Sequence, residues 1–464
     1  MRAIVVASGI ALSLAASLEA HAFCGFFVAG SDARLYNNAS QVALLRKGNR
    51  TTMTLSNNYQ GPPEDFAMVV PVPVVLHKED VKTLAANVFD HVDALSAPRL
   101  VEYWEIDPCD PPRPRKYKKG GKPGGMVDEK EREDGAGLGV KIEAQFVVGE
   151  YEIVILSATE SSGLDKWLRL NHYKIPDGAA EALAPYVRQQ SKFFVAKVDI
   201  KKVNRDEHGK VVLSPLRFGF ESNDLRLPVR LGLLNARDKQ DLIVYVLSPT
   251  SRFEAANYPN VFAPTNLEVA DAVRAAFPSF YAQLFDAVVA LHQGRAVVTE
   301  YAWQTGSCDP CPTPPLDAAD LKLLGDDGDS PDVYSWVLTR LHTRYDRQSL
   351  SEDLIFREAK PAEGGRSSWN GASGENDGHV SDGGSNNFQA RYIIRHYWSG
   401  PLKCDKPEWG NWGGPPDGQA PSPSAAKGLA DAPRGKLSLK EVVHTKLPEL
   451  KLPGHAAPQH KSQP

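Results

Sequence analysis

Hydrophobic and polar positions alternate in short patches along most of the chain, with a few stretches at helical spacing between them. Residues 42–45 and 51–55 are rich in β-forming side chains and flank a Lys-Gly-Asn turn, which predicts two short strands. Residues 66–75 form a second apolar run, and Pro71 and Pro73 favour the edge of a sheet for it. The N-terminal part therefore begins as β-structure.

Apolar residues recur at helical spacing in five further segments, which we predict to be helices. Pro278 is expected to kink or break the fourth of them. The segments are 79–95, 164–170, 178–190, 266–292 and 331–346.

Other segments read as strands, and they do not alternate regularly with the helices. A regular βαβ alternation would indicate a doubly wound sheet, so the pattern predicts an α+β fold with mixed and antiparallel sheets and several packed helices. The predicted strands are 100–106, 140–148 paired with 151–156, 193–203, 211–246, 296–303 and 392–398.

Shifts in composition divide the chain into seven parts. They are a signal peptide (1–22), an N-terminal α+β part (23–106), a disordered charged loop (107–139), a main α+β part (140–360), a flexible Gly/Ser/Asn loop (361–388), a closing strand (389–409) and a disordered tail (410–464). The N-terminal and main parts are expected to form one body.

Three segments share a sequence pattern in which a predicted strand with aromatic residues is followed by a Cys-Asp pair and a nearby proline. Residues 101–104 lead to Cys109, residues 299–303 to Cys308, and residues 396–398 to Cys404. The first two strands also follow predicted helices, so a strand–helix–strand unit is either duplicated here or matched by chance in a chain rich in Trp and Pro. Either way, each strand brings a cysteine to a sheet rim.

The N-terminus has the form of an export signal. Arg2 precedes an uncharged apolar run, and Ala20-His21-Ala22 places small residues at the positions that signal peptidase requires. We therefore expect cleavage after Ala22 and a periplasmic or extracellular protein; the alternative is an uncleaved anchor. No later segment has 18 uninterrupted apolar residues, so no transmembrane segment is expected after cleavage.

Composition excludes several classes of protein. The 464 residues carry 53 Lys+Arg and 57 Asp+Glu, and 42 % are hydrophobic, as in ordinary globular proteins rather than fibrous or disordered ones. A net charge of −4 lacks the basic surplus that binding to phosphate backbones needs, so no nucleic-acid partner is expected.

The five cysteines are Cys24, Cys109, Cys308, Cys311 and Cys404, and all five are disulfide candidates. Cys308 and Cys311 have C-x-x-C spacing, which three chemistries use. A zinc site requires a second pair of ligands. A thioredoxin-like redox pair requires a helix that begins directly after the motif, and in this sequence prolines occupy those positions. Structural disulfides in an oxidising compartment are the third reading. Two bonds would leave one thiol over, either Cys24 or one of the C-x-x-C pair.

No short catalytic signature of a zinc peptidase, an α/β-hydrolase, a P-loop protein or a dinucleotide fold stands in a fitting context, and we predict no metal site and no cofactor. Weak catalytic candidates remain. His342 and Asp346 would share one face of the helix predicted over 331–346, as an acid–base pair or as a salt-bridged helix end. Glu102 and Glu300 occupy matching strand positions and would form a carboxylate pair if they met.

The sequence resembles a bacterial family, domain-of-unknown-function family 2330. The resemblance is carried by seven short motifs, and it extends from about Cys24 to Cys404 without the 107–139 loop and the tail. They are CGFFVA at 24–29, YQG at 59–61 with FAMVVPVP at 66–73, VEY at 101–103, NHYKIP at 171–176, CDPC at 308–311 and TRLHTRY at 339–345. The resemblance implies an exported protein, chiefly of Gram-negative bacteria, and it implies no particular activity.

Two hypotheses about function follow. The first is a non-catalytic envelope or extracellular binding or structural protein, whose aromatic strands bind an envelope component or a small ligand. The second is a hydrolase or transferase acting on an envelope substrate through His342 with Asp346 or through Glu102 with Glu300. Convergence of these polar groups in one pocket would favour the enzyme.

Overall fold

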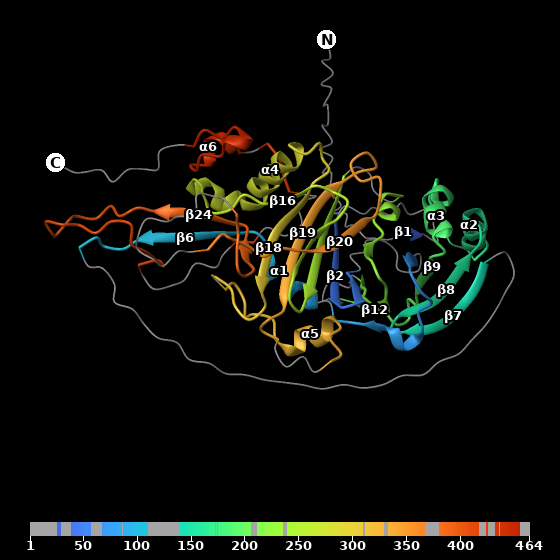
Figure 1. Cartoon of the computed structure of the whole chain (residues 1–464). Helices are drawn as coiled ribbons and strands as arrows, with labels where there is room; N and C mark the ends of the chain where they lie inside the picture. Colours follow the sequence, from blue (N-terminus) through green and yellow to red (C-terminus); the bar gives the residue numbers. More distant parts are fainter. Residues whose placement is uncertain are drawn as a thin grey trace, which may run out of the picture.

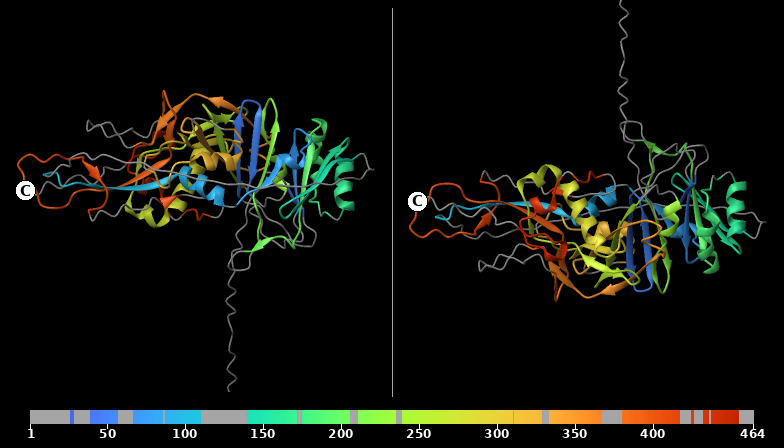
Figure 2. Two further views of the ribbon diagram at one scale, coloured as in Figure 1. Left: turned by 90° about the horizontal axis from the view of Figure 1, so that it is seen from below. Right: turned by 90° about the horizontal axis from the view of Figure 1, so that it is seen from above.

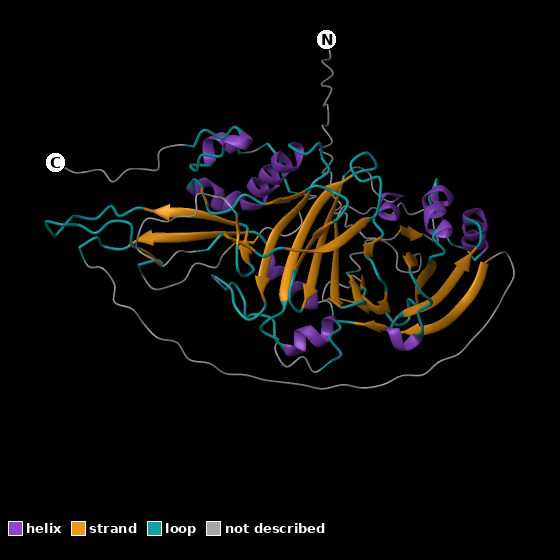
Figure 3. Ribbon diagram, viewed as in Figure 1, coloured by secondary structure: helices purple, strands orange, loops and turns teal. Residues whose placement is uncertain are grey.

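The structure is a computed structural model. It describes residues 26–28, 39–56, 67–85, 87–109, 140–171, 173, 175–205, 211–234, 239–309, 311–328, 333–366, 380–416, 424–425, 432–435 and 437–454. Two sheets are stacked in the body with helices on their outer faces, and a third sheet extends away from them (Figure 1; Figure 3).

The central sheet is built from strands that are far apart in the sequence. Its order is β22-β21-β23-β18-β19-β14-β2-β3-β12-β5, with β16 beside β18. β2 runs parallel to β14, whereas β19 runs antiparallel to both β14 and β18. The strands are β2 (Ala39–Lys47), β3 (Arg50–Leu55), β5 (Val81–Thr83), β12 (Leu216–Glu221), β14 (Gln240–Ser248), β16 (Asn260–Phe262), β18 (Val297–Gln304), β19 (Val337–Tyr345), β21 (Ala362–Gly364), β22 (Ser381–Asp382) and β23 (Asn387–Gln389).

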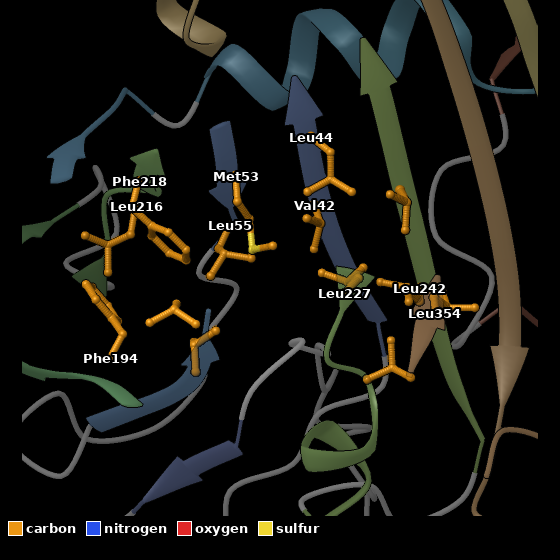
Figure 4. Packing of buried hydrophobic residues seen from close by; sticks show 14 of the residues in the cluster. Val42, Leu44, Met53, Leu55, Phe194, Leu216, Phe218, Leu227, Leu242 and Leu354 are labelled. Carbon is orange, nitrogen blue, oxygen red and sulfur yellow. The ribbon is translucent and has the colours of Figure 1, made fainter. Parts of the chain in front are cut away.

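A second, antiparallel sheet packs on one face of the central sheet. Its order is β1 (Phe26–Val28), β4 (Ala67–Val72), β9 (Lys192–Val198), β8 (Tyr151–Ala158) and β7 (Val140–Val148). Buried side chains of both sheets fill the space between them (Figure 4). The helices α2 (Ser161–Leu170) and α3 (Ala179–Arg188) cover the outer face of this second sheet.

Burial on both faces explains why several strands read as continuous apolar runs. Val42 and Leu44 point into the core between the sheets, while Ala43 and Leu45 point to the opposite face. That opposite face is covered by α1 (Asn87–Ser96) and α5 (Ala318–Leu324). A strand that is buried on both sides has no reason to alternate with polar residues.

The third sheet contains β6 (Arg99–Glu105) and β24 (Arg391–His396), which run parallel to each other. These two strands reach beyond the body (Figure 1), and two further views show the same extension (Figure 2). We call this extension, residues 99–109 and 391–413, the arm. β17 (Leu267–Glu268), β25 (Trp412–Gly413) and β26 (Ser424–Ala425) complete the sheet, and α4 (Phe277–Ala290) covers one of its faces.

Smaller elements connect these layers. They are the pair β10 (Asn204–Arg205) and β11 (Val211–Val212), the sheet of β13 (Leu225–Leu227), β20 (Leu354–Ala359) and β15 (Arg252–Ala255), the short helix α6 (Leu439–Val442), and the 3-10 helices η2 (Lys78–Asp80), η3 (Arg230–Leu234), η4 (Asp271–Ala276) and η5 (Pro448–Leu450).

The predicted α+β class is confirmed, with mixed and antiparallel sheets and packed helices. The hairpin over 140–156 forms as β7 and β8, with Gly149 at φ +56° in its turn. The helices expected at 164–170 and 178–190 form as α2 and α3. These are the segments in which local pattern and tertiary packing agree.

The helix predicted over 331–346 is wrong, because Val337–Tyr345 is the strand β19. Its helical spacing of apolar residues is overridden by pairing along nine residues of β14 on one side and by β18 on the other. Both faces of β19 are buried, so apolar residues occur at most positions and match a helical period by chance.

Two other helix predictions are wrong in extent. Residues 79–95 divide into a 3-10 turn, the strand β5 and the later helix α1. Residues 266–292 divide into β17, η4 and α4. Pro278 does not kink a helix but lies in the first turn of α4, where its missing N–H and fixed φ cost nothing.

The expectation of a disordered tail over 410–464 is wrong for the part that the structure describes. β25 and β26 pair with β6, and residues 437–454 dock on the body through four buried side chains beside α4: Val442, Val443, Leu447 and Leu452. The expected flexible loop at 361–388 likewise contains β21, β22 and the start of β23. Sheet pairing over very short segments leaves too weak a pattern to read locally.

The three aromatic strands that resemble one another in sequence do not share one environment. β6 pairs in parallel with β24, whereas β18 pairs antiparallel with β19, so the strand pairing does not repeat. The first and third strands are neighbours in the arm, and Trp104 lies opposite His396. Their cysteines therefore leave the sheet side by side.

The prediction of intramolecular disulfides is confirmed for four of the five cysteines. Cys109 and Cys404 are bonded with their Cα atoms 5.5 Å apart, and Cys308 and Cys311 are bonded with theirs 4.9 Å apart. Cys24 and the predicted cleavage site lie outside the described residues. Among the helices that the structure describes, none combines the length and the apolar character needed to cross a bilayer.

Candidate functional site

The four candidate catalytic residues separate into three places. Glu300 and His342 meet in the interior, Glu102 lies on the arm, and Asp346 takes part in neither cluster. Glu102 and Glu300 therefore do not form the expected carboxylate pair: their side chains bind different partners on different sheets.

A β-bulge in β18 directs the Glu300 side chain toward β19 and α4. The register between β18 and β19 shifts between Thr299 and Tyr301, which leaves Glu300 as the extra residue. Its carboxylate accepts hydrogen bonds from Arg340 Nε at 2.6 Å and from the Tyr281 hydroxyl at 2.7 Å, and it lies 2.7 Å from His342 Nδ1. One carboxylate thus joins β18 to β19 and to α4.

Arg340 extends this cluster toward α1. Its Nη1 donates a short hydrogen bond to Asp93, and the Tyr245 hydroxyl donates to the same carboxylate at 2.8 Å. His342 Nε2 lies 3.5 Å from Asp241 on β14. We call these seven side chains the ion network: Asp93, Asp241, Tyr245, Tyr281, Glu300, Arg340 and His342.

Burial and charge act in opposite directions on the titrating members of the ion network. Burial lowers the pKa of His342, but the Glu300 and Asp241 carboxylates raise it by more, so the pKa rises to about 9. Burial raises the pKa of Glu300, but His342 and Arg340 lower it by more, so the pKa falls to about 2. At neutral pH the imidazolium and the carboxylate are therefore both charged.

The ion network is closed to solvent. Arg340 and Glu300 are 1 % exposed and His342 is 2 % exposed. The His342 ring also stacks on Phe285 of α4, with 4.2 Å between ring centroids. In this arrangement their hydrogen bonds hold α1, α4 and three strands together.

Asp346 ends the strand instead of acting with His342. Its carboxylate accepts hydrogen bonds from the backbone N–H groups of Gln348 and Ser349, at 2.9 and 2.8 Å. In a strand, two residues four positions apart are separated by about 13 Å, whereas on the expected helix they would be neighbours. The proposed His342–Asp346 pair is therefore wrong because β19 is not a helix.

Glu102 belongs to a cluster on the face of the arm that α4 partly covers. Arg274 of η4 donates to the Glu102 carboxylate from Nε at 2.8 Å and from Nη2 at 2.7 Å. His396 Nε2 lies 2.7 Å from the same carboxylate, and its ring stacks on Trp104 with 4.4 Å between centroids. Hydrogen bonding to Arg274, together with His396, lowers the pKa of Glu102 against its partial burial.

The opposite face of the arm carries a second group of aromatic and charged side chains. Arg395 donates to Glu268 at 2.7 Å and lies over the Trp412 ring, 5.1 Å from its centroid. Tyr397 donates to Glu268 at 2.9 Å and meets Trp412 edge-on. Ion pairs and ring contacts thus fix the orientation of these side chains.

The arm differs from the ion network in its access to solvent. The side chain of Arg274 is 43 % exposed and that of His396 is 28 % exposed. A cleft of about 470 Å³ lies elsewhere, lined by residues that include Arg46, Asn223 and Glu358. The side chains of the Glu102 cluster are therefore partly open to solvent, whereas those of the ion network are not.

Nothing in the described part of the chain groups three or more His, Cys, Asp or Glu side chains as a metal site would. Sequence reasoning missed His396 and Arg274, which complete the Glu102 cluster. The shared aromatic plan of residues 101–104 and 396–398 was the signal that could have placed His396 beside Trp104. No sequence pattern predicted the contact between Arg274 and Glu102, because η4 and β6 are far apart in the sequence.

The fold and these two clusters define a mixed-sheet α+β protein with a charged core and a disulfide-closed arm. A family model described as an uncharacterized protein conserved in bacteria (DUF2330) matches residues 18–357, and the chain belongs to that family. No curated protein matches the sequence.

One solved structure that the chain partly matches is a mutated baculovirus P35 after caspase cleavage. The identity is 12 %, the match covers 46 % of this chain and 66 % of that one, and the TM-score is 0.26. A score this low carries no information about fold or function.

Replacement of Arg340 tests whether the ion network is structural. The substitution Arg340→Ala leaves Asp93 buried without its cation and leaves Glu300 with His342 alone, which should lower the free energy of unfolding by roughly 3–5 kcal/mol. Urea denaturation measures this loss. Arg169→Ala, which breaks the exposed pair with Asp165, is the matched control and should cost well under about 1 kcal/mol. Equal costs for the two variants would contradict the structural role.

The pH dependence of stability tests the charge on His342. Its pKa is raised in the folded protein, so protonation stabilises the fold fully below about pH 6.5, and this contribution is lost as the pH rises to about 9. Over that window the decline should be on the order of 1 kcal/mol per pH unit. His342→Gln should remove most of this decline in urea midpoints, since only the smaller share from His91 beside Asp320 remains, whereas the half-buried control His292→Gln should keep it. A wild-type protein whose stability stays level over this window would refute the assignment.

Proposed function

We propose that the protein is exported and acts outside the cytoplasm as a non-catalytic binding protein, with the arm as the surface that binds another envelope protein. The observation that carries the proposal is the arm itself, an extension beyond the body whose two faces hold ordered, partly exposed aromatic and charged side chains.

Export is supported by two independent features. The first 22 residues have the charge, apolar run and small-residue site of a signal peptide. The chain also has two disulfides, which form and persist in oxidising compartments and are rare in the cytosol.

The type of partner follows from the shape and composition of the arm. Sites for small molecules are concave, whereas the arm is a projecting sheet. Trp, Tyr and Arg dominate the binding energy of protein interfaces, and the arm presents Trp104, Trp409 and Trp412 with Arg395 and Tyr397. A protein surface therefore fits the arm better than a small ligand.

A hydrolase or transferase acting on an envelope substrate is the second candidate. The hydrogen bond between Glu102 and His396 favours this candidate, because a general-base histidine is often oriented by a carboxylate in this way. Within the described residues, His396 Nε2 lies within hydrogen-bond distance of Glu102 and Arg274 and not of a nucleophile. Binding is thus the better supported role.

Export can be tested by fractionation and N-terminal sequencing. When a Gram-negative host expresses the full chain, we expect the protein outside the cytoplasm, beginning at Phe23, with the signal removed. A cytoplasmic protein that still begins at Met1 would contradict the proposal.

Site-specific photo-crosslinking tests the binding surface in intact cells. A photoreactive residue in place of the exposed Leu402, beside the arm disulfide, should give one discrete cross-linked product, and the same residue at exposed Tyr334 on the body should not. Trp104→Ala should weaken the product at least about tenfold, as loss of an interface anchor does, while Tyr334→Ala should leave it unchanged. Equal cross-linking from both positions, or no effect of Trp104→Ala, would argue against the arm.

A further inference from the structure

The two disulfides differ in what they can contribute to stability. Cys109–Cys404 joins residues 295 positions apart, whereas Cys308–Cys311 joins residues three positions apart. A cross-link stabilises mainly by restricting the unfolded chain, and the effect grows with the length of the loop that it closes. The long-range bond therefore holds the arm closed, and the short-range bond adds comparatively little to the fold.

The segment around Cys308 and Cys311 is held in place without their bond. Before it, Thr305 N donates to Trp336 O at 2.8 Å, and Trp303 Nε1 donates to Ser307 Oγ at 3.1 Å. After it, His91 Nε2 lies 2.9 Å from the Pro314 carbonyl oxygen, and Asp317 caps α5. Opening the short disulfide would leave both ends of the loop anchored.

The two cysteines of this pair differ in their exposure to solvent. Cys311 is exposed, whereas Cys308 is half-buried and packs against the hydrophobic cluster under α1 and α5. Cys109 and Cys404 are also half-buried. Cys311 is therefore the most exposed disulfide-bonded residue in the described part of the chain, and we expect an external thiol to attack there.

We propose that Cys308–Cys311 is a site of thiol–disulfide exchange with an external thiol, in which Cys311 is the sulfur attacked. An external thiolate bonds to Cys311 Sγ, the Cys308–Cys311 bond breaks, and Cys308 leaves as a thiolate that takes a proton from water. A second external thiolate then attacks the external sulfur of this mixed disulfide and releases Cys311. Two thiols are oxidised to one disulfide, and the protein gains a dithiol.

This site does not copy the thioredoxin arrangement. There the cysteine pair opens a helix, which lowers the pKa of the attacking thiol. Here the nearest following helix, α5, begins at Ala318, seven residues after Cys311. The Cys308–Cys311 disulfide is thus suited to reduction by an external thiol, such as the dithiol of a reductase. Its dithiol form is less suited to reducing other proteins.

Limited reduction of the folded, full-length protein by reduced glutathione, quenched with iodoacetamide and mapped by mass spectrometry, tests the proposal. We expect glutathione on Cys311 and the alkyl group on Cys308, formed at least about tenfold faster than any opening of Cys109–Cys404. Glutathione mainly on Cys308, or opening of Cys109–Cys404 first, would overturn it.

Two double variants separate exchange from a structural role. Cys109→Ser with Cys404→Ser should keep the exchange rate of the short pair, because that pair does not depend on the arm clasp. Cys308→Ser with Cys311→Ser should keep the wild-type melting temperature much more closely than the first double variant does. If both double variants lose the same stability, the short disulfide is structural and the proposal fails.

Discussion

The guanidinium of Arg340 is the group on which the arrangement of the body depends. It is 1 % exposed, and it bridges Asp93 on α1 and Glu300 on β18 from its own place on β19. Removing Arg340 would leave the Asp93 carboxylate buried without its cation and take one of two cations from Glu300, which costs far more than an exposed ion pair contributes. The network therefore fixes how α1, α4 and three strands of the central sheet meet, and Glu300 and His342 both belong to it.

The position of the arm depends on elements of the body that the ion network holds in place. β6 follows directly after α1, whose Asp93 binds Arg340, and η4 leads into α4, whose Tyr281 binds Glu300. Arg274 of η4 then bonds to Glu102 in the arm. The ion network and the Glu102 cluster are thus connected through the backbone, by α1 with β6 and by η4 with α4, and the Cys109–Cys404 bond ties the far ends of β6 and β24 together.

The sequence predicted the class of fold and its disulfide chemistry well, because those properties depend on local pattern and on residue type. It failed for β19, whose residues satisfy a helical period only because both faces of the strand are buried. It also separated His342 from Glu300, since their meeting depends on a bulge in β18 that has no local signature. The docking of residues 437–454 was missed for a related reason. Four apolar side chains in a polar, proline-containing segment do not predict an ordered element by themselves, and they become buried only by packing beside α4.

An NMR titration of the His342 imidazole in the folded protein tests the account most directly. The interior network requires the imidazole to stay protonated through neutral pH and to lose its proton only near pH 9, because two carboxylates outweigh the cost of burial. A titration midpoint near the ordinary value of about 6.5 would contradict this account. It would mean that the two carboxylates do not hold the proton on His342, and the structural account of the ion network would fail.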